Sequence, residues 1–142
     1  MFWDQFITTT FLTGLFASGI RLGTPLLLTA LGDTISQRAG VLNIGLEGLM
    51  IIGALAGFLG GYFAGTPWIG VLCAMLAGAL LSSIHGLLCA KFAADQIISG
   101  LALNVLGLGL AILVFRGVFG MTIIEEPQSP HFNLINIPLL SD

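Results

Sequence analysis

The sequence predicts an all-α integral membrane protein, with about four transmembrane helices preceded by an interfacial or tilted N-terminal helix. Its 142 residues are 56% hydrophobic and only 8% charged, whereas soluble domains carry about 25% charged residues. The mean hydropathy is +1.05. Three stretches contain no Asp, Glu, Lys or Arg: residues 48–65, 66–90 and 96–115. A bilayer span needs about 20 mostly apolar residues, so each stretch is long enough, or nearly so, to cross a membrane.

The N-terminal part is predicted to form the first crossing together with the segment that leads into it. Residues 1–22 are apolar but rich in Thr and Ser, and they begin with aromatic residues of the type that favours the membrane interface. Residues 23–38 are short for a span. We therefore expect them to run together with part of the preceding segment, with a bend near Gly23 and Pro25.

Three further crossings are expected, from about Val41 to Gly65, from Pro67 to Ala90 and from Gln96 to about Gly117. The second and third carry small residues at every fourth position. Such rows let another helix approach closely, so both helices should pack tightly against neighbours. The expected packing residues are Gly53, Gly57, Gly61 and Gly65 on the second crossing, and Ala74, Gly78, Ser82, Gly86 and Ala90 on the third.

Charged loops predict how the chain is oriented in the cell membrane. Arg38 and Lys91 fall in loops separated by two crossings, whereas Arg116 falls on the opposite side. Cytoplasmic loops carry an excess of basic residues, so the Arg38 and Lys91 loops are predicted to be cytoplasmic. Residues 1–119 would then form the transmembrane part, and residues 120–142 an extracytoplasmic loop rich in proline and acidic residues.

A carboxylate and an amide stand among glycines at the beginning of the second crossing. A charged group near the bilayer centre costs about 2.5 to 3.5 kcal/mol, so Glu47 needs an explanation. Asn43 lies four residues earlier and would share a helix face with it, while Gly40, Gly45 and Gly48 would loosen the helix. Many transporters build their site from such a broken helix. Glu47 is therefore either part of a transport path or a carboxylate stabilised by water and the helix dipole near the cytoplasmic end.

Other polar residues favour structural roles. His85, Ser82, Ser83 and Asn104 lie deep in apolar stretches, where an interhelical hydrogen bond is the first interpretation and a proton relay the alternative. His131 has no second His or Cys at ligand spacing, so no metal site is predicted. The sequence contains no phosphate-binding loop and no nucleophilic triad, so neither a cofactor nor ATP hydrolysis by this chain is expected. The net charge of -3 comes from only eleven groups and does not indicate a nucleic-acid partner.

Two motifs carry a family resemblance. The segments GVLNIGLEG at residues 40–48 and DQIISGLALN at residues 95–104, with their flanks, resemble the permease subunits of ABC importers of the branched-chain amino acid and simple-sugar superfamily. The similarity is greatest to the nucleoside and simple-sugar branch, and it extends into the tail sequence INIPLLSD. The resemblance makes these motif positions candidates for the translocation path: Asn43, Gly45, Glu47, Gly48, Gln96, Ser99, Gly100 and Asn104. Asp95 also falls on the second motif.

The resemblance implies a transmembrane permease subunit that forms part of the translocation pathway for a nucleoside or simple sugar. Its implied partners are a cytoplasmic ATP-binding subunit, a second permease subunit in a heterodimer, an extracytoplasmic substrate-binding protein and the surrounding lipid. Family permeases are considerably longer, so we interpret the chain as the N-terminal portion of a permease or a truncated gene product. Two alternatives stay open: a small proton-coupled multidrug antiporter that uses Glu47, and a non-transporting membrane assembly subunit.

Overall fold

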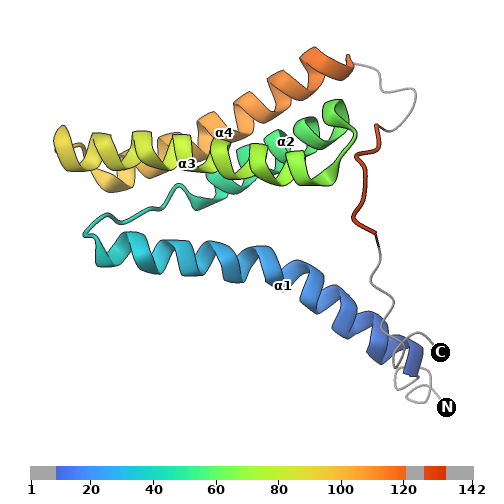
Figure 1. Cartoon of the computed structure of the whole chain (residues 1–142). Coiled ribbons are helices and arrows are strands. Elements are labelled where there is room, and N and C mark those ends of the chain that lie inside the picture. The colour runs from blue at the N-terminus through green and yellow to red at the C-terminus, as the bar shows by residue number, and fades with distance from the viewer. Residues whose placement is uncertain (1–8, 121–126, 134–142) are drawn as a thin grey trace. The chain divides into compact units, whose positions relative to one another are not determined.

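A computed structural model of the chain describes residues 9–120 and 127–133, and within them it is all-helical (Figure 1). The helices are α1 (Thr9–Arg38), α2 (Leu46–Ala64), α3 (Pro67–Lys91) and α4 (Gln96–Phe119). All four are long and apolar enough to cross a membrane. The predicted all-α membrane fold with about four spans is confirmed. The chain divides into two compact units, Met1–Leu42 and Asn43–Asp142.

The first unit is built on α1, a single helix of 30 residues. No separate helix precedes the first crossing within the described residues; the two predicted segments run together, as expected. Pro25 lies inside the helix, and Figure 1 shows α1 with a bend along its length. Proline lacks the N–H that would continue the helical hydrogen bonds, which is the usual cause of such bends. The interfacial aromatic residues expected near the N-terminus, Phe2 and Trp3, lie outside the described residues.

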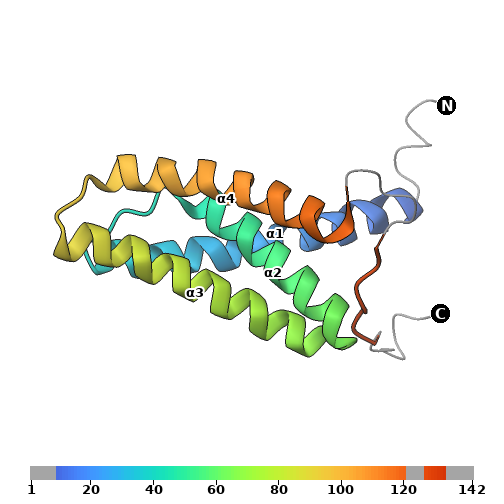
Figure 2. The same cartoon turned by 90° about the horizontal axis from the view of Figure 1, so that it is seen from above.

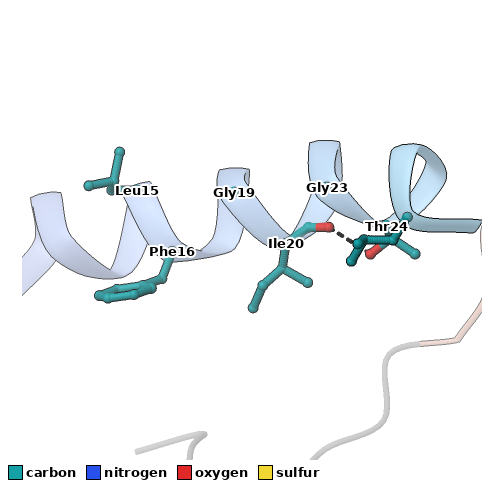
Figure 3. Close-up of a pocket in the computed structure, with 7 residues that line it drawn as sticks. Leu15, Phe16, Gly19, Ile20, Gly23 and Thr24 are labelled. Atoms are coloured by element: carbon teal, nitrogen blue, oxygen red, sulfur yellow. Dashed lines mark hydrogen bonds between the residues drawn. The ribbon is translucent and has the colours of Figure 1, made fainter. Parts of the chain in front are cut away.

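A shallow groove runs over Gly19 and Gly23 on α1, because these two residues have no side chains to fill it. Figure 3 shows Phe16 and Ile20 beside it. The hydroxyl of Thr24 donates a 2.6 Å hydrogen bond to the carbonyl oxygen of Ile20 in its own helix. A hydroxyl satisfied in this way is tolerated in apolar surroundings. The groove therefore offers mainly apolar surface, and we place no functional site there.

The second unit holds α2 between α3 and α4 (Figure 2). Near its start α2 meets α4 backbone to backbone, because a Cβ added at Gly107 would lie 2.7 Å from the Cα of Gly48. Towards its end α2 meets α3 just as closely: a Cβ at Gly70 would lie 2.6 Å from the carbonyl oxygen of Gly57. Helix α2 thus runs obliquely from one neighbour to the other.

The small residues of the predicted packing rows are used only in part. Gly57 faces Ala74, since a Cβ added at Gly57 would lie 3.3 Å from the Cβ of Ala74. Gly53 is looser, at 3.9 Å from the Ala74 carbonyl oxygen, and Gly61 faces Ser129. Beyond Ala74 the α3 row meets no other described residue closely, because Gly78 and Gly86 have nothing within 4 Å and Ser82 is exposed. Their role in packing stays a prediction.

Aromatic rings occupy the space between α2 and α4 at the end remote from Gly48. Phe58 and Tyr62 of α2 meet Phe119 of α4, with ring centroids 5.9 and 5.2 Å apart. Phe115 lies 6.1 Å from Phe58. Large rings fill a gap that glycines would leave empty. The two helices are therefore in close backbone contact at one end and held apart by rings at the other.

The described part of the tail lies against the same end of the bundle. Helix α2 ends at Ala64 and is capped by Gly65, whose φ of +67° is readily adopted by glycine. Its amide donates to the Gly61 carbonyl oxygen. The hydroxyl of Ser129 fits beside Gly61, and Phe132 makes an edge contact with Trp68 at 5.1 Å between centroids. The segment 127–133 therefore contacts the last turns of α2 and the first turn of α3.

Candidate functional site

The chain ahead of α2 is not helical, which corrects one prediction. Helix α2 begins at Leu46 rather than near Val41, so Asn43 and Glu47 do not share a helix face. The side-chain oxygen of Asn43 accepts a 3.0 Å hydrogen bond from the amide of Gly45. Asparagine side chains that bond the backbone two residues on favour turns over helix. The local sequence thus delays the helix by about one turn.

Asn104 joins this turn to α4. Its side-chain nitrogen donates to the carbonyl oxygen of Ile44 at 3.1 Å. Its side-chain oxygen accepts from the amide of Gly48 at 2.8 Å. Gly45, at the N-cap position of α2, has no side chain and makes no capping hydrogen bond. One residue of α4 therefore satisfies a backbone acceptor and a backbone donor on the two sides of the helix start.

Glycines on both elements make this contact possible. A Cβ added at Gly45 would lie 2.9 Å from the Gly100 carbonyl oxygen, and one added at Gly100 would lie 2.9 Å from the Gly45 amide nitrogen. A Cβ at Gly48 would overlap the carbonyl oxygen of Leu103. These neighbours are mostly backbone atoms, which cannot swing aside. Any larger residue would push α2 away from α4 and out of reach of Asn104.

A second polar contact ties α4 to α3. His85 is only 1% exposed, and its Nδ1 lies 3.0 Å from the hydroxyl oxygen of Ser99. The Cys89 sulfur lies 3.7 Å from the other ring nitrogen. An interhelical hydrogen bond, the first interpretation of His85, is confirmed. Ser83 instead donates to the Ala79 carbonyl oxygen of its own helix.

The remaining motif residues lie at the edge of this cluster. Glu47 is exposed in the first turn of α2. Gln96 is the first residue of α4 and is half-buried. Asp95 caps α4, because its carboxylate accepts from the amides of Ile97 and Ile98 at 2.8 and 3.1 Å. A capping carboxylate at a helix N-terminus is stabilising, which gives Asp95 a structural role.

The structure brings together six of the eight candidate residues at the start of α2 and the first half of α4: Asn43, Gly45, Gly48, Ser99, Gly100 and Asn104. The sequence analysis did not single out Gly107, which packs against Gly48. The signal was present, because Gly107 lies seven residues after Gly100, which is about two helical turns and therefore the same face. Within the described ranges, no three His, Cys, Asp or Glu side chains could hold a metal ion.

Comparison with known proteins identifies the family. Residues 15–138 match the family model for the permease component of branched-chain amino acid transport systems. The chain belongs to this permease family. The four helices of the described part that are long and apolar enough to cross a membrane agree with a multi-pass membrane protein of this family. No solved structure matches the chain.

Curated relatives of the chain are named as permeases for nucleosides and glucose. The guanosine ABC transporter permease protein NupQ of Bacillus subtilis is 44% identical over 124 residues, which cover 83% of this chain and 39% of that protein. The putative glucose ABC transporter permease protein TsgC13 of Haloferax volcanii is 36% identical over 94% of this chain and 42% of its own length. The nucleoside ABC transporter permease protein NupC of Lactococcus lactis is 34% identical over 89% and 41%. The chain thus spans about two fifths of the length of these relatives.

Proposed function

We propose that the chain is part of the permease subunit of an ATP-driven importer and contributes to the translocation pathway for a nucleoside or simple sugar. The observation that carries the proposal is the family match over residues 15–138. The names of the relatives, which include guanosine, nucleoside and glucose permeases, supply the substrate class.

The arrangement at the start of α2 supports this function. Membrane transporters place substrate near interrupted helices, where backbone groups leave the regular hydrogen-bond pattern. Here non-helical chain directly precedes Leu46, so its backbone groups also lie outside a regular helix, and the exposed carboxylate of Glu47 follows directly. We assign Glu47 to the translocation path, on the side predicted to be cytoplasmic.

The proposed assembly has four kinds of component around this chain. A separate cytoplasmic subunit binds and hydrolyses ATP, so the permease itself is not an enzyme. A second permease subunit completes the pathway as a heterodimer, and an extracytoplasmic protein delivers the substrate. The segment after α4 is proposed to face the extracytoplasmic side of the cell membrane, because Arg38 and Lys91 at the other ends of the helices favour the cytoplasm.

Uptake by the complete transporter in proteoliposomes tests the proposal. Labelled guanosine and labelled glucose are offered with the substrate-binding protein outside and ATP inside. ATP-dependent accumulation of one of them is expected. Uptake that follows a proton gradient without ATP would instead support a proton-coupled antiporter, and unchanged uptake by the partner subunits without this permease would support an assembly role.

Glu47→Gln tests the assignment of the carboxylate. A hydrogen bond to a charged group contributes about 1.5 to 3 kcal/mol. Loss of such a bond between the Glu47 carboxylate and the substrate should therefore lower the uptake rate at least about tenfold. The control is Glu47→Asp, which keeps the charge and should retain more of the rate. If both variants match the parent while assembly is unchanged, the carboxylate serves only the helix dipole.

A further inference from the structure

Backbone amides at the start of α2 have no hydrogen-bond acceptors within the helix itself. The first amides of any helix lack carbonyl partners four residues earlier. Gly45 stands at the N-cap position and offers no side chain to accept from them. Towards the membrane interior fewer water molecules can replace the missing partners, and each backbone group left unsatisfied is costly. Some other part of the molecule must therefore satisfy the groups around this junction.

Asn104 is suited to this task by the chemistry of its side chain. It donates to the Ile44 carbonyl oxygen, just ahead of the helix, and accepts from the Gly48 amide, within its first turn. A carboxamide supplies a donor and an acceptor from one planar group. A carboxylate of the same size could only accept, and a leucine could do neither. The two backbone partners have fixed roles, and they therefore fix the orientation of the amide.

Close contacts between glycines of α2 and α4 determine which groups the Asn104 side chain can reach. Gly100 packs against the turn before α2. A Cβ added at Gly100 would lie 2.9 Å from the Gly45 amide nitrogen and 3.1 Å from the Cβ of Ile44. The Cα of Asn104 would lie only 2.9 Å from a Cβ at Gly48. The short Asn104 side chain thus reaches both backbone partners because α2 and α4 touch through their main chains. Its two hydrogen bonds bracket the exposed residue Glu47.

We propose that Asn104 is a positioning residue for transport: it clamps the start of α2 onto α4 and thereby fixes where Glu47 stands. The link to transport rests on the proposed function, whereas the clamp itself does not. Asn104 uses one N–H and one lone pair on the protein backbone, and these two bonds hold its side chain against the start of α2. Its loss should slow turnover without weakening substrate binding.

A spin label tests the clamp without any transport measurement. The full-length permease is prepared with Cys73→Ala and Cys89→Ala, and a label is attached to Leu42→Cys, whose native side chain is 51% exposed. In the parent the label next to the clamped turn should be restricted. Asn104→Leu should make it mobile, and Asn104→Asp, which keeps only the acceptor, should give an intermediate spectrum. Asn133→Leu is the matched control, because Asn133 is exposed and lies in the segment after α4.

Uptake by the assembled transporter tests the consequence for function. Asn104→Leu should lower the maximal rate about tenfold or more, because the Gly48 amide and the Ile44 carbonyl oxygen lose their partner together, while KM stays unchanged. The maximal uptake rate of Asn104→Asp should lie between that of Asn104→Leu and that of the parent. Asn133→Leu should leave both parameters at parent values.

The possible failures can be told apart. A label that stays restricted in Asn104→Leu would overturn the clamp, and a raised KM with an unchanged rate would overturn the positioning role by making Asn104 a ligand. If Asn104→Leu does not reach the membrane, the Asn104→Asp variant decides by the same two measurements. If the parent transporter takes up neither nucleoside nor sugar, the proposed function fails while the label experiment still judges the clamp.

Discussion

The two ends of α2 are held by different kinds of contact. At its start, Gly45 and Gly48 bring the backbone against α4, and Asn104 adds two hydrogen bonds across the contact. At its end, the backbone approaches α3 instead, and rings such as Phe58 fill the space towards α4. The start combines close backbone spacing with directional hydrogen bonds to α4, whereas the end combines close backbone packing against α3 with aromatic side chains that fill the space towards α4.

The comparison teaches that glycine serves two purposes in this bundle. At the start of α2 it brings polar groups within hydrogen-bonding distance, so a small displacement removes both packing and hydrogen bonds. At the α2–α3 contact it permits close van der Waals packing between Gly57, Gly70 and their neighbours. Replacing a glycine at the α2–α4 contact should therefore lower the free energy of unfolding more than an equivalent replacement at the α2–α3 contact.

Gly107→Ala should give the largest effect. Its Cβ would lie 2.7 to 3.0 Å from three backbone atoms of Gly48, none of which can rotate away. We expect a loss of about 3 kcal/mol in the free energy of unfolding, measured by denaturant titration of the full-length permease in mixed micelles. Gly109→Ala, two residues along α4, is the control because nothing lies within 4 Å of it. Equal stability of the two variants would show that α2 and α4 do not meet in this way.

Gly70→Ala should have a smaller effect, at the other end of α2. Its Cβ would lie 2.6 Å from the Gly57 carbonyl oxygen and 3.2 Å from the Gly61 amide nitrogen. A shift of α3 relieves the overlap without breaking a clamp, so we expect a loss of about 2 kcal/mol in the same titration. Gly78→Ala, on the same helix with open space around it, should leave the midpoint near that of the parent. If Gly70→Ala lost more free energy of unfolding than Gly107→Ala, the α2–α3 contact and not the α2–α4 contact would be the more sensitive one.

Gly53→Ala should change stability least. Its Cβ would meet only the Ala74 carbonyl oxygen at 3.9 Å, an ordinary van der Waals contact. Alanine also favours helix over glycine by up to about 1 kcal/mol. The free energy of unfolding should therefore stay within about 0.5 kcal/mol of the parent or rise slightly. A clear destabilisation would mean that Gly53 faces a further helix of the assembled transporter.

Much of the fold follows from the sequence because a bilayer imposes simple demands. Uncharged stretches of sufficient length predicted the helices from Pro67 and Gln96 closely, and their boundaries agree with the structure to within two residues or so. The first crossing was harder, because polar Thr and Ser residues obscured a continuous helix from Thr9 to Arg38. The start of α2 was set too early, since the competing turn at Asn43 depends on a single side-chain hydrogen bond.

The sequence by itself determined the membrane class, the number of spans and, through its two motifs, the permease family. Those properties depend on composition and on residue order, which the sequence contains in full. Only the tertiary structure decided which polar residues meet: Asn104 with the backbone of Ile44 and Gly48, and His85 with Ser99. These partners are 14 to 60 residues apart in the chain. Their contact depends on how closely glycines allow three helices to approach, which no local pattern specifies.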